Sequence, residues 1–493
     1  MKHWRFLCGL LAMGLICTGC GLTAAPENTK DVPAVTAGEA VVGETDAPGP
    51  EQEAESALTL DVGVTYQTLE GFGASGGWWA QDVGGWTEEE NGVPLREQVL
   101  ALLYDPETGI GLDIYRYNLG ASTREKEYTG IFWDNWRRAE SFLTSEGAVD
   151  YTRDANAVWC MEEAVRLGAS QVVFFANSAP DQMTANGLAH CDKPGTCNLP
   201  EENYQAFADY CIGAAKHFRE RGIPVTQLSP VNEPQWDWTE GQEGCYFTAE
   251  QLVSLYRVFQ QTMNAELPEV ELSLPESGEW KNNQIKQYIT GIMKDDLLSR
   301  TVKFIDGHSY WTDKMDKQLF KAWMDQNYPD LKLRATEWCQ MANGREETMR
   351  SALELASVII EDLTVLDVTA WSCWLGVSRY DYHDGLMYVH SFTHEITPVK
   401  RLWAYGNFSR FIQPGAVRIE AETGIRDVSA VAFTQSGETV AVLVNRGKNH
   451  TLSIPANARV YLTDAEHDLV EVENTVVQTL PAESVITVII PAE

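Results

Sequence analysis

Two glutamates stand in peptides that could carry acid–base and nucleophilic chemistry. Glu233 lies in LSPVNEPQWDW and Glu337 lies in LRATEWCQM, each after a short apolar run, at 225–231 and 331–335. Cleavage of an acetal between two sugars needs a proton for the leaving oxygen and a negative group beneath the charge that develops on the ring. Two carboxyls in different environments can supply both without metal or cofactor. The pair therefore predicts a glycosidase, although a lone Asn-Glu-Pro could equally cap a helix that begins at the proline.

The chain from Leu58 onward is expected to alternate strands and helices. Segments such as 204–221, 249–264 and 348–363 place apolar side chains three and four residues apart, as helices with one buried face do. Apolar runs with strand character lie near 67–73, 112–118, 171–177, 225–232, 269–275, 302–308, 331–336 and 367–373. This alternation predicts an α/β fold, a (β/α)8 TIM barrel over 65–397, in which catalytic residues lie at the carboxyl ends of the strands.

Six separate segments resemble glycoside hydrolase family 30, within clan A of the retaining β-glycosidases. In chain order they are TLEGFGASGGWWAQ (68–81), LDIYRYNLGAST (112–123), VVFFANSAPDQMTANG (172–187), SPVNEPQWDW (229–238), FIDGHSYWTD (304–313) and ATEWC (335–339). The resemblance extends from Leu58 to the C-terminus, in the family's own order. It implies an acid/base after strand four, a nucleophile after strand seven and retention of anomeric configuration. Two of the motifs look most like the branch that contains endo-β-1,6-galactanases.

The resemblance implies that Glu233 is the acid/base and Glu337 the nucleophile. The acid/base must start protonated, and a partly apolar setting near Trp236 together with the charge of Glu337 would raise its pKa. Glu337 must start ionised and therefore needs hydrogen-bond donors, for which the family places an Arg and a Tyr at Arg116 and Tyr310. The two carboxyls should lie about 5 to 5.5 Å apart, and the reaction should pass through a covalent glycosyl-enzyme.

Further residues near the strand ends are predicted to contact the sugar. Asn232 precedes the acid/base and stands where the clan has an Asn that hydrogen-bonds the 2-hydroxyl. The other predicted contacts are Trp79, Asn177, His308, Trp311 and Trp371, in addition to Trp236. Adjacent residues on a strand point to opposite faces, so at most one of Trp78 and Trp79 can face the cleft. Each of these residues also has a purely structural interpretation, as a loop-forming Asn, an interior His or a core Trp.

The last hundred residues or so carry a different pattern. Short alternating apolar runs separated by turn residues predict an all-β sandwich over 398–493. Family 30 members complete such a sandwich with a strand that precedes the barrel, which implies that residues 57–64 join it. The segment has few of the Trp and Tyr clusters typical of a glycan-binding module, so a structural role is favoured.

The N-terminus is predicted to be a targeting segment. Residues 1–20 combine basic residues, an apolar stretch and a final Thr-Gly-Cys, which resembles a bacterial lipoprotein signal with lipidation of Cys20. Cys17 departs from the usual Leu three places earlier, so ordinary secretion stays open. Residues 21–56 are rich in Pro, Gly, Ala and acidic residues, which predicts a disordered tether. We expect an extracellular monomer, anchored to the cell membrane through this lipid alone.

The net charge and the cysteine content limit the classes of partner and cofactor that we expect. A formal net charge of -34 disfavours nucleic acid, whereas a neutral oligo- or polysaccharide would not be repelled. Three of the ten cysteines lie in the leader, and Cys191 and Cys197 bracket a short loop in which they could close a disulfide if the protein is exported. Outside the leader, where Cys17 and Cys20 are spaced as CxxC, no CxxC pair is present, so we expect no metal and no cofactor.

Two alternatives to endo-β-1,6-galactanase activity on a plant- or microbe-derived polysaccharide stay open. One is another family 30 activity, such as that of a xylanase, a β-1,6-glucanase, a β-xylosidase or a β-fucosidase. The other is a noncatalytic, glycan-binding surface lipoprotein. The presence of both glutamates, together with Asn232, Arg116 and Tyr310, argues against loss of catalysis.

Overall fold

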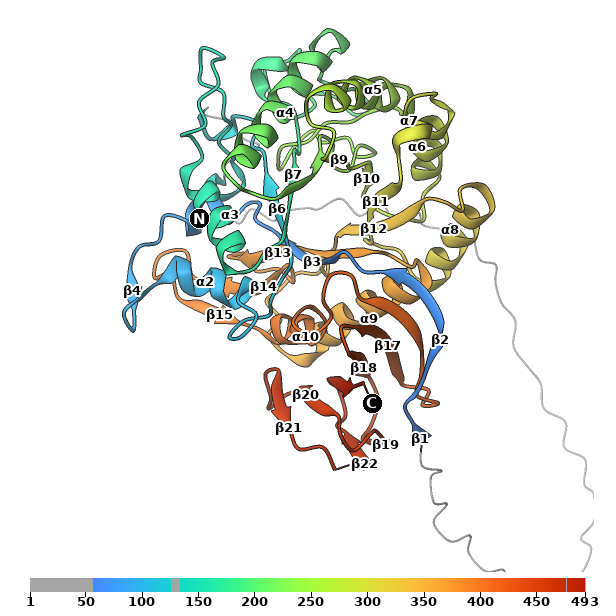
Figure 1. Ribbon diagram of the computed structural model, residues 1–493. Coiled ribbons are helices and arrows are strands. Elements are labelled where there is room, and N and C mark those ends of the chain that lie inside the picture. Colours follow the sequence, from blue (N-terminus) through green and yellow to red (C-terminus); the bar gives the residue numbers. More distant parts are fainter. Residues whose placement is uncertain (1–55, 126–133, 476, 493) are drawn as a thin grey trace, which may run out of the picture. The chain divides into compact units, whose positions relative to one another are not determined.

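The computed structural model describes residues 56–125, 134–475 and 477–492 (Figure 1). The expected signal peptide with Cys20, and all but the last residue of the expected tether, lie outside these ranges. Within them, no helix has both the length and the apolar run that crossing a bilayer requires.

The larger domain is built around a closed ring of parallel strands. In ring order these are β3 (Gly71–Ser75), β6 (Ile114–Asn118), β7 (Gln171–Phe175), β8 (Val225–Ser229), β9 (Glu271–Leu272) with β10 (Pro275–Ser277), β11 (Phe304–His308), β12 (Lys332–Glu337) and β13 (Ala370–Ser378). β9 pairs with β8, and β10 pairs with β11. Between them, Ser273 N–H donates to the Leu228 carbonyl (2.9 Å) and Asp306 N–H donates to the Leu274 carbonyl (2.8 Å), which closes the ring. The (β/α)8 barrel is therefore confirmed, and its strands overlap the eight apolar runs, the first of which begins in the strand before the barrel, at 59–68.

Helices surround this ring (Figure 1). They are α1 (Ala80–Val83), α2 (Leu95–Tyr104), α3 (Ala155–Leu167), α4 (Tyr204–Glu220), α5 (Ala249–Glu266), α6 (Asn283–Lys294), α7 (Leu298–Thr301), α8 (Lys314–Asn327), α9 (Met349–Val365) and α10 (Lys400–Ser409). Several begin at side-chain caps, such as the Thr248–Gln251 capping box of α5 and Asn282 before α6. These caps satisfy N–H groups that the first helical turn leaves free. The helices pack one apolar face on strands that are buried on both sides, as parallel strands require.

Short elements decorate the barrel. They are the hairpin β4 (Glu89–Glu90) and β5 (Val93–Pro94), the strands β14 (Gly385–Val389) and β15 (Ile396–Pro398) that extend the sheet beyond β13, and the 3-10 turns η1 (Thr123–Glu125), η2 (Asn135–Arg137), η3 (Asp181–Met183) and η4 (Glu201–Asn203).

The C-terminal segment folds as two facing sheets. The larger has the order β2 (Thr59–Thr68), β16 (Val417–Glu422), β17 (Val428–Gln435), β18 (Glu438–Asn445), β23 (Ser484–Pro491), β20 (Arg459–Thr463) and β21 (Val470–Val472). The smaller contains β1 (Ser56–Ala57), β19 (His450–Ser453) and β22 (Val477–Leu480). Leu443 and Ile486 of the first sheet share an apolar core with Leu452 and Leu480 of the second. The all-β domain is confirmed, and the segment before the barrel enters both sheets through β1 and β2.

α10 lies directly after the boundary expected between 397 and 398. It packs against α9, β3 and β14 of the barrel and also against β20 and β23 of the second domain, so it contacts both domains. The alternating pattern of the second domain begins only at β16. α9 in turn packs against β17, β18 and β23, which joins the barrel to the second domain.

Candidate active site

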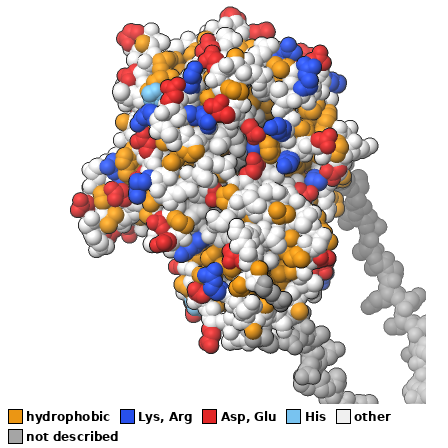
Figure 2. Space-filling view, in the orientation of Figure 1, with side chains coloured by type: hydrophobic (Ala, Val, Ile, Leu, Met, Phe, Trp, Pro, Cys, Tyr) orange, Lys and Arg blue, Asp and Glu red, His pale blue; other side chains and the backbone are white. Residues whose placement is uncertain are grey.

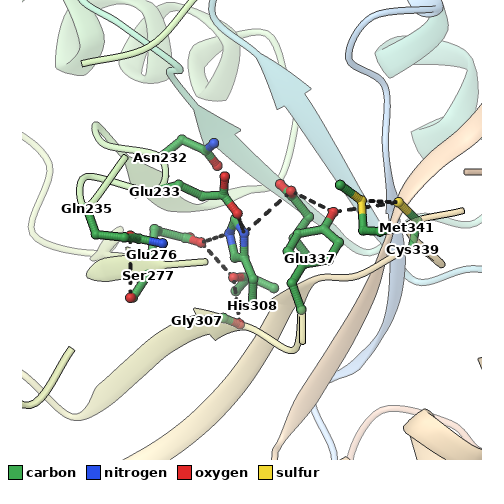
Figure 3. A network of polar contacts seen from close by, with 12 residues as sticks. Asn232, Glu233, Gln235, Glu276, Ser277, Gly307, His308, Glu337, Cys339 and Met341 are labelled. Carbon is green, nitrogen blue, oxygen red and sulfur yellow. Dashed lines mark hydrogen bonds and ion pairs between the residues drawn. The ribbon is translucent and has the colours of Figure 1, made fainter. Parts of the chain in front are cut away.

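The barrel brings the two predicted glutamates together at the carboxyl ends of its strands. Glu233 lies four residues after the end of β8, and Glu337 is the last residue of β12. His308, the last residue of β11, lies between them, with Nδ1 2.9 Å from Glu233 Oε1 and 3.4 Å from Glu337 Oε1 (Figure 3). One oxygen of each carboxylate and this nitrogen all lie within 4.8 Å of one another. The site therefore holds two carboxyls across a gap of sugar-ring size.

Glu337 is surrounded by hydrogen-bond donors. The Tyr310 hydroxyl donates to Oε1 (3.0 Å), and Arg116 Nη1 forms an ion pair with Oε2. Arg116 also donates from Nη2 to Asn232 Oδ1 (3.1 Å), which places the predicted 2-hydroxyl partner beside the predicted nucleophile. Donors of this kind stabilise the ionised carboxylate. The arrangement is the one that a carboxylate nucleophile needs.

Glu233 has the opposite surroundings. Its burial raises its pKa and the negative charge of Glu337 adds to the rise, although the hydrogen bond and the charge of His308 act against it. Its backbone has a φ of 45°, and the Trp238 indole donates to its carbonyl (2.8 Å), so the loop is held in a conformation that few non-glycine residues adopt. A carboxyl with a raised pKa is suited to give a proton to a leaving oxygen.

A third carboxylate, Glu276, was not identified from the sequence. It lies in β10 with 0% exposure, and its Oε2 accepts from His308 Nε2 (3.1 Å) and from the Thr336 hydroxyl (2.6 Å). Burial alone would raise its pKa, but the hydrogen bond from His308 and the charge of Arg116 lower it to about 2. The same strand-end rule that selects Glu233 and Glu337 could have found it, because it immediately follows the run predicted at 269–275.

His308 is held as a cation by these carboxylates. Burial alone would lower its pKa, but the charge of Glu337 and the hydrogen bonds with Glu233 and Glu276 raise it to about 10. Each ring nitrogen then donates to a different glutamate. Among the described residues, the group that could offer three ligand atoms to a metal ion is Glu233, His308 and Glu337. The same three side chains are in direct polar contact, with His308 Nδ1 2.9 Å from Glu233 Oε1 and 3.4 Å from Glu337 Oε1.

Three aromatic side chains pack together near the two glutamates. Trp236 and Trp311 pack edge to face, with ring centroids 5.7 Å apart, and Trp311 is 50% exposed. Tyr310 lies beside Trp311 at 5.4 Å. The half-exposed indole of Trp311 offers an apolar face on which a sugar ring can stack.

Two predicted sugar contacts lie elsewhere. Trp79 is 0% exposed and donates its indole N–H to the Ser75 carbonyl (2.8 Å), while Trp371 is also 0% exposed and donates to Asp362 (2.9 Å). Both rings are packed in the core, so neither can stack on a substrate. Trp79 stands at the N-cap of α1, where the strand alternation has ended, and Trp371 faces Tyr405 of α10.

Trp78 and Asn177 complete the inventory of predicted residues. Trp78 packs edge to face on Trp374 (5.2 Å), which in turn contacts Phe175 (6.2 Å), the ring that lies beneath the Arg116 guanidinium. Trp78, rather than Trp79, therefore belongs to the aromatic group that reaches the site. Asn177 is buried next to Asn118, and its Oδ1 has no partner among the described residues.

Comparison with known proteins identifies the family. Residues 55–388 match the model of O-glycosyl hydrolase family 30. The chain belongs to this family. It is 28% identical over 222 residues to an endo-beta-1,6-galactanase from Hypocrea rufa, covering 41% of this chain and 45% of that relative. It is 22% identical over 303 residues to glucuronoxylanase XynC from Bacillus subtilis, covering 59% of this chain and 63% of that relative.

Among solved structures, a conserved exported protein from Bacteroides fragilis is similar over most of the fold. It shares 25% identity with a TM-score of 0.79, over 88% of this chain and 100% of that one. The chain thus matches 45% and 63% of the length of the two curated relatives, and its fold extends over the whole of the solved Bacteroides fragilis chain.

Proposed function

We propose that this protein is a retaining β-glycoside hydrolase that cleaves a neutral polysaccharide by double displacement. The observation that carries the proposal is the placement of one oxygen from each of Glu233 and Glu337 within 4.8 Å around His308. Carboxyls about 5 to 5.5 Å apart leave room for direct attack on the anomeric carbon, whereas inverting enzymes separate them by about 6.5 to 9.5 Å.

In the first step, Glu337 attacks the anomeric carbon while Glu233 gives its proton to the departing oxygen. Arg116 and Tyr310 hold Glu337 in place, and Asn232 lies where it can hydrogen-bond the 2-hydroxyl beside the nucleophile. The positive imidazolium of His308 stabilises Glu233 once its proton has left. In the second step, Glu233 takes a proton from water, and the water cleaves the glycosyl ester.

The substrate that we propose is a β-1,6-linked galactan, cleaved internally. Its support is the likeness of the motifs around Trp79 and Glu233 to the endo-β-1,6-galactanase branch and the partial match to the Hypocrea rufa enzyme. On the face that Figure 2 shows, basic side chains are scattered among acidic ones, which suits a neutral chain better than a polyanion. A glucuronoxylan is the second candidate, because the Bacillus subtilis relative is named for it.

A panel of polysaccharides tests this function. The protein is incubated with β-1,6-galactan, β-1,6-glucan, xylan and aryl glycosides, and the products are separated by size. We expect oligosaccharides from β-1,6-galactan, loss of turnover in Glu337→Ala, and a fall of about 10²- to 10⁴-fold in Glu233→Ala. Products from xylan alone would mean that xylan, and not β-1,6-galactan, is the substrate. Wild-type turnover by Glu337→Ala would remove that residue from the mechanism. Binding of glycan without products would favour the noncatalytic alternative.

We further propose that the protein is exported and anchored by a lipid on Cys20. The support is the signal-like pattern of residues 1–20 and the likeness to an exported protein of similar fold. Labelling cells with an alkyne analogue of palmitate should mark the wild-type chain but not Cys20→Ala. Equal labelling of both would exclude lipidation at this cysteine.

A further inference from the structure

Three thiols meet where two loops of the barrel cross. Cys197, in the loop after β7, has its Sγ 3.6 Å from Sγ of Cys245, in the loop after β8. Cys245 interacts on its other side with the thiol of Cys191. The other four cysteines of the described residues, Cys160, Cys211, Cys339 and Cys373, are buried elsewhere in the barrel. The three thiols thus form a cluster that the catalytic mechanism does not use.

Backbone hydrogen bonds already fix these two loops against each other. Cys191 N–H donates to the Trp238 carbonyl (2.9 Å), and Gly244 N–H donates to the Ala189 carbonyl (3.0 Å). Gly195 N–H adds a bond to the Asp237 carboxylate (2.7 Å). Since a disulfide has an S–S length of about 2.05 Å, side-chain rotation and an approach of roughly 1.5 Å would join Cys197 to Cys245.

The cluster is chemically suited to thiol–disulfide exchange. The hydrogen bond from Cys245 lowers the pKa of Cys191 to about 7 and also lowers the pKa of Cys197, whereas burial raises the pKa of Cys245. Cys197 is only partly buried, so it is the thiol of the pair that an oxidant reaches first.

We propose that Cys197 and Cys245 form a disulfide by exchange with a low-molecular-weight disulfide, leaving Cys191 as a thiol. The Cys197 thiolate attacks the small disulfide and releases one small thiol. Cys245, after losing its proton, attacks the Cys197 sulfur and releases the second. Two protein thiols thereby lose two electrons and two protons, and one small disulfide becomes two thiols.

The bond would tie the loop that follows β7 to the loop that carries the acid/base. Trp238, whose carbonyl accepts from Cys191, also donates its indole N–H to the Glu233 carbonyl. The disulfide would close the segment of chain between Cys197 and Cys245 and so restrict the unfolded state. We therefore expect oxidation to stabilise the folded chain and to raise Tm by roughly 4 °C. Because backbone hydrogen bonds already hold the two loops together in the reduced protein, kcat should change less than about twofold.

Peptide mapping of the full chain tests the pairing. The reduced protein is treated with oxidised glutathione, blocked with N-ethylmaleimide and cleaved before aspartates, which separates Cys191 (181–191), Cys197 (192–208) and Cys245 (237–294) into different peptides. We expect mass spectrometry to find 192–208 linked to 237–294, and the link to disappear after reduction. A link of 181–191 to either other peptide, or three blocked thiols, would overturn the proposal.

Serine variants provide the matched controls. Cys191→Ser should keep both the linked peptides and the rise in Tm, whereas Cys197→Ser should lose both. A rise in Tm on oxidation of Cys197→Ser equal to that of the wild type would contradict the assignment. None of these readouts depends on the glycosidase activity, so they stand apart from the test of the proposed function.

Discussion

At the scale of single residues, one histidine organises the site. His308 Nδ1 lies beside Glu233 and Glu337, while its Nε2 bonds Glu276 (Figure 3). The sequence singled out His308 and both proposed catalytic glutamates because motifs surround them. Glu276 stands in Pro-Glu-Ser, which has no motif around it, so only its position at the end of the run at 269–275 could have identified it before β10 and β11 were seen to pair.

Glu276→Gln should weaken catalysis at high pH. The change keeps the shape of the side chain but removes a negative charge that helps to keep His308 protonated, so the pKa of His308 falls. We expect the alkaline limb of the kcat/KM profile to move to lower pH, with a fall in kcat/KM of about tenfold above neutral pH.

Thr336→Val is the control for this change, because it removes a hydrogen bond to the same Glu276 oxygen without removing a charge. Its alkaline limb should stay in place. An unmoved limb in Glu276→Gln would show that Glu276 does not act through His308.

The exposed fraction of a tryptophan ring separates predicted substrate contacts from residues of the hydrophobic core. Trp311→Ala should raise KM for polysaccharide about tenfold with little change in Tm, because half of this ring is exposed. Trp79→Ala should destabilise the fold by about 3 to 5 kcal/mol, because its fully buried ring would leave a cavity. Denaturant unfolding and steady-state kinetics check both variants, and the reverse pattern would restore Trp79 as a cleft residue.

At the scale of elements, the carboxyl ends of the barrel strands position the side chains of the site. Sequence patterning predicted the barrel strands because each is a compact apolar run bounded by turns. α10 was missed because Gly406, Asn407 and Ser409 are weak helix formers in its last turns. Its packing stabilises it instead, and a Cβ at Gly406 would clash with Leu469 and Ile110, which no sequence pattern could show.

The segment after β10 must pass close to the acid/base, so Gly278 should be intolerant of substitution. A Cβ there would lie 2.5 Å from Glu233 Oε1 and 2.5 Å from Gln235 Nε2. We expect Gly278→Ala to lower kcat/KM about 100-fold by displacing Glu233. Gly291→Ala, which adds the same methyl group in α6 with its nearest neighbour at 3.2 Å, should change kcat/KM less than twofold. Equal activities would mean that the loop can move aside.

At the scale of the whole molecule, buried acids link stability to pH. Burial raises the pKa of Asp113 and Glu243 to about 7 and that of Asp154 to about 8. These groups bind protons more tightly when folded, so they favour the folded state most at low pH, and this contribution is lost as pH rises from about 4 towards 8. The contribution of His308 is fully present below pH 6.5 and is lost as pH rises through about 10.

Stability should therefore be greatest in mildly acid solution. Glu276 sets the acid limit, because its contribution is present above pH 4.5 and is lost as pH falls towards about 2. We expect Tm to peak near pH 5 and to fall by about 5 °C or more by pH 9. The net charge of -34 adds repulsion in the same direction. Calorimetry across this range checks the trend, and a Tm that rises from pH 5 to pH 9 would contradict it.

The central claim is that Glu337 attacks the sugar directly while Glu233 acts as acid and then as base. Proton NMR of the first sugar released from a β-glycoside, recorded before mutarotation, tests this claim most directly. The account predicts that the β-anomer appears first. Initial release of the α-anomer would mean that water attacks in a single displacement and that Glu337 is a base.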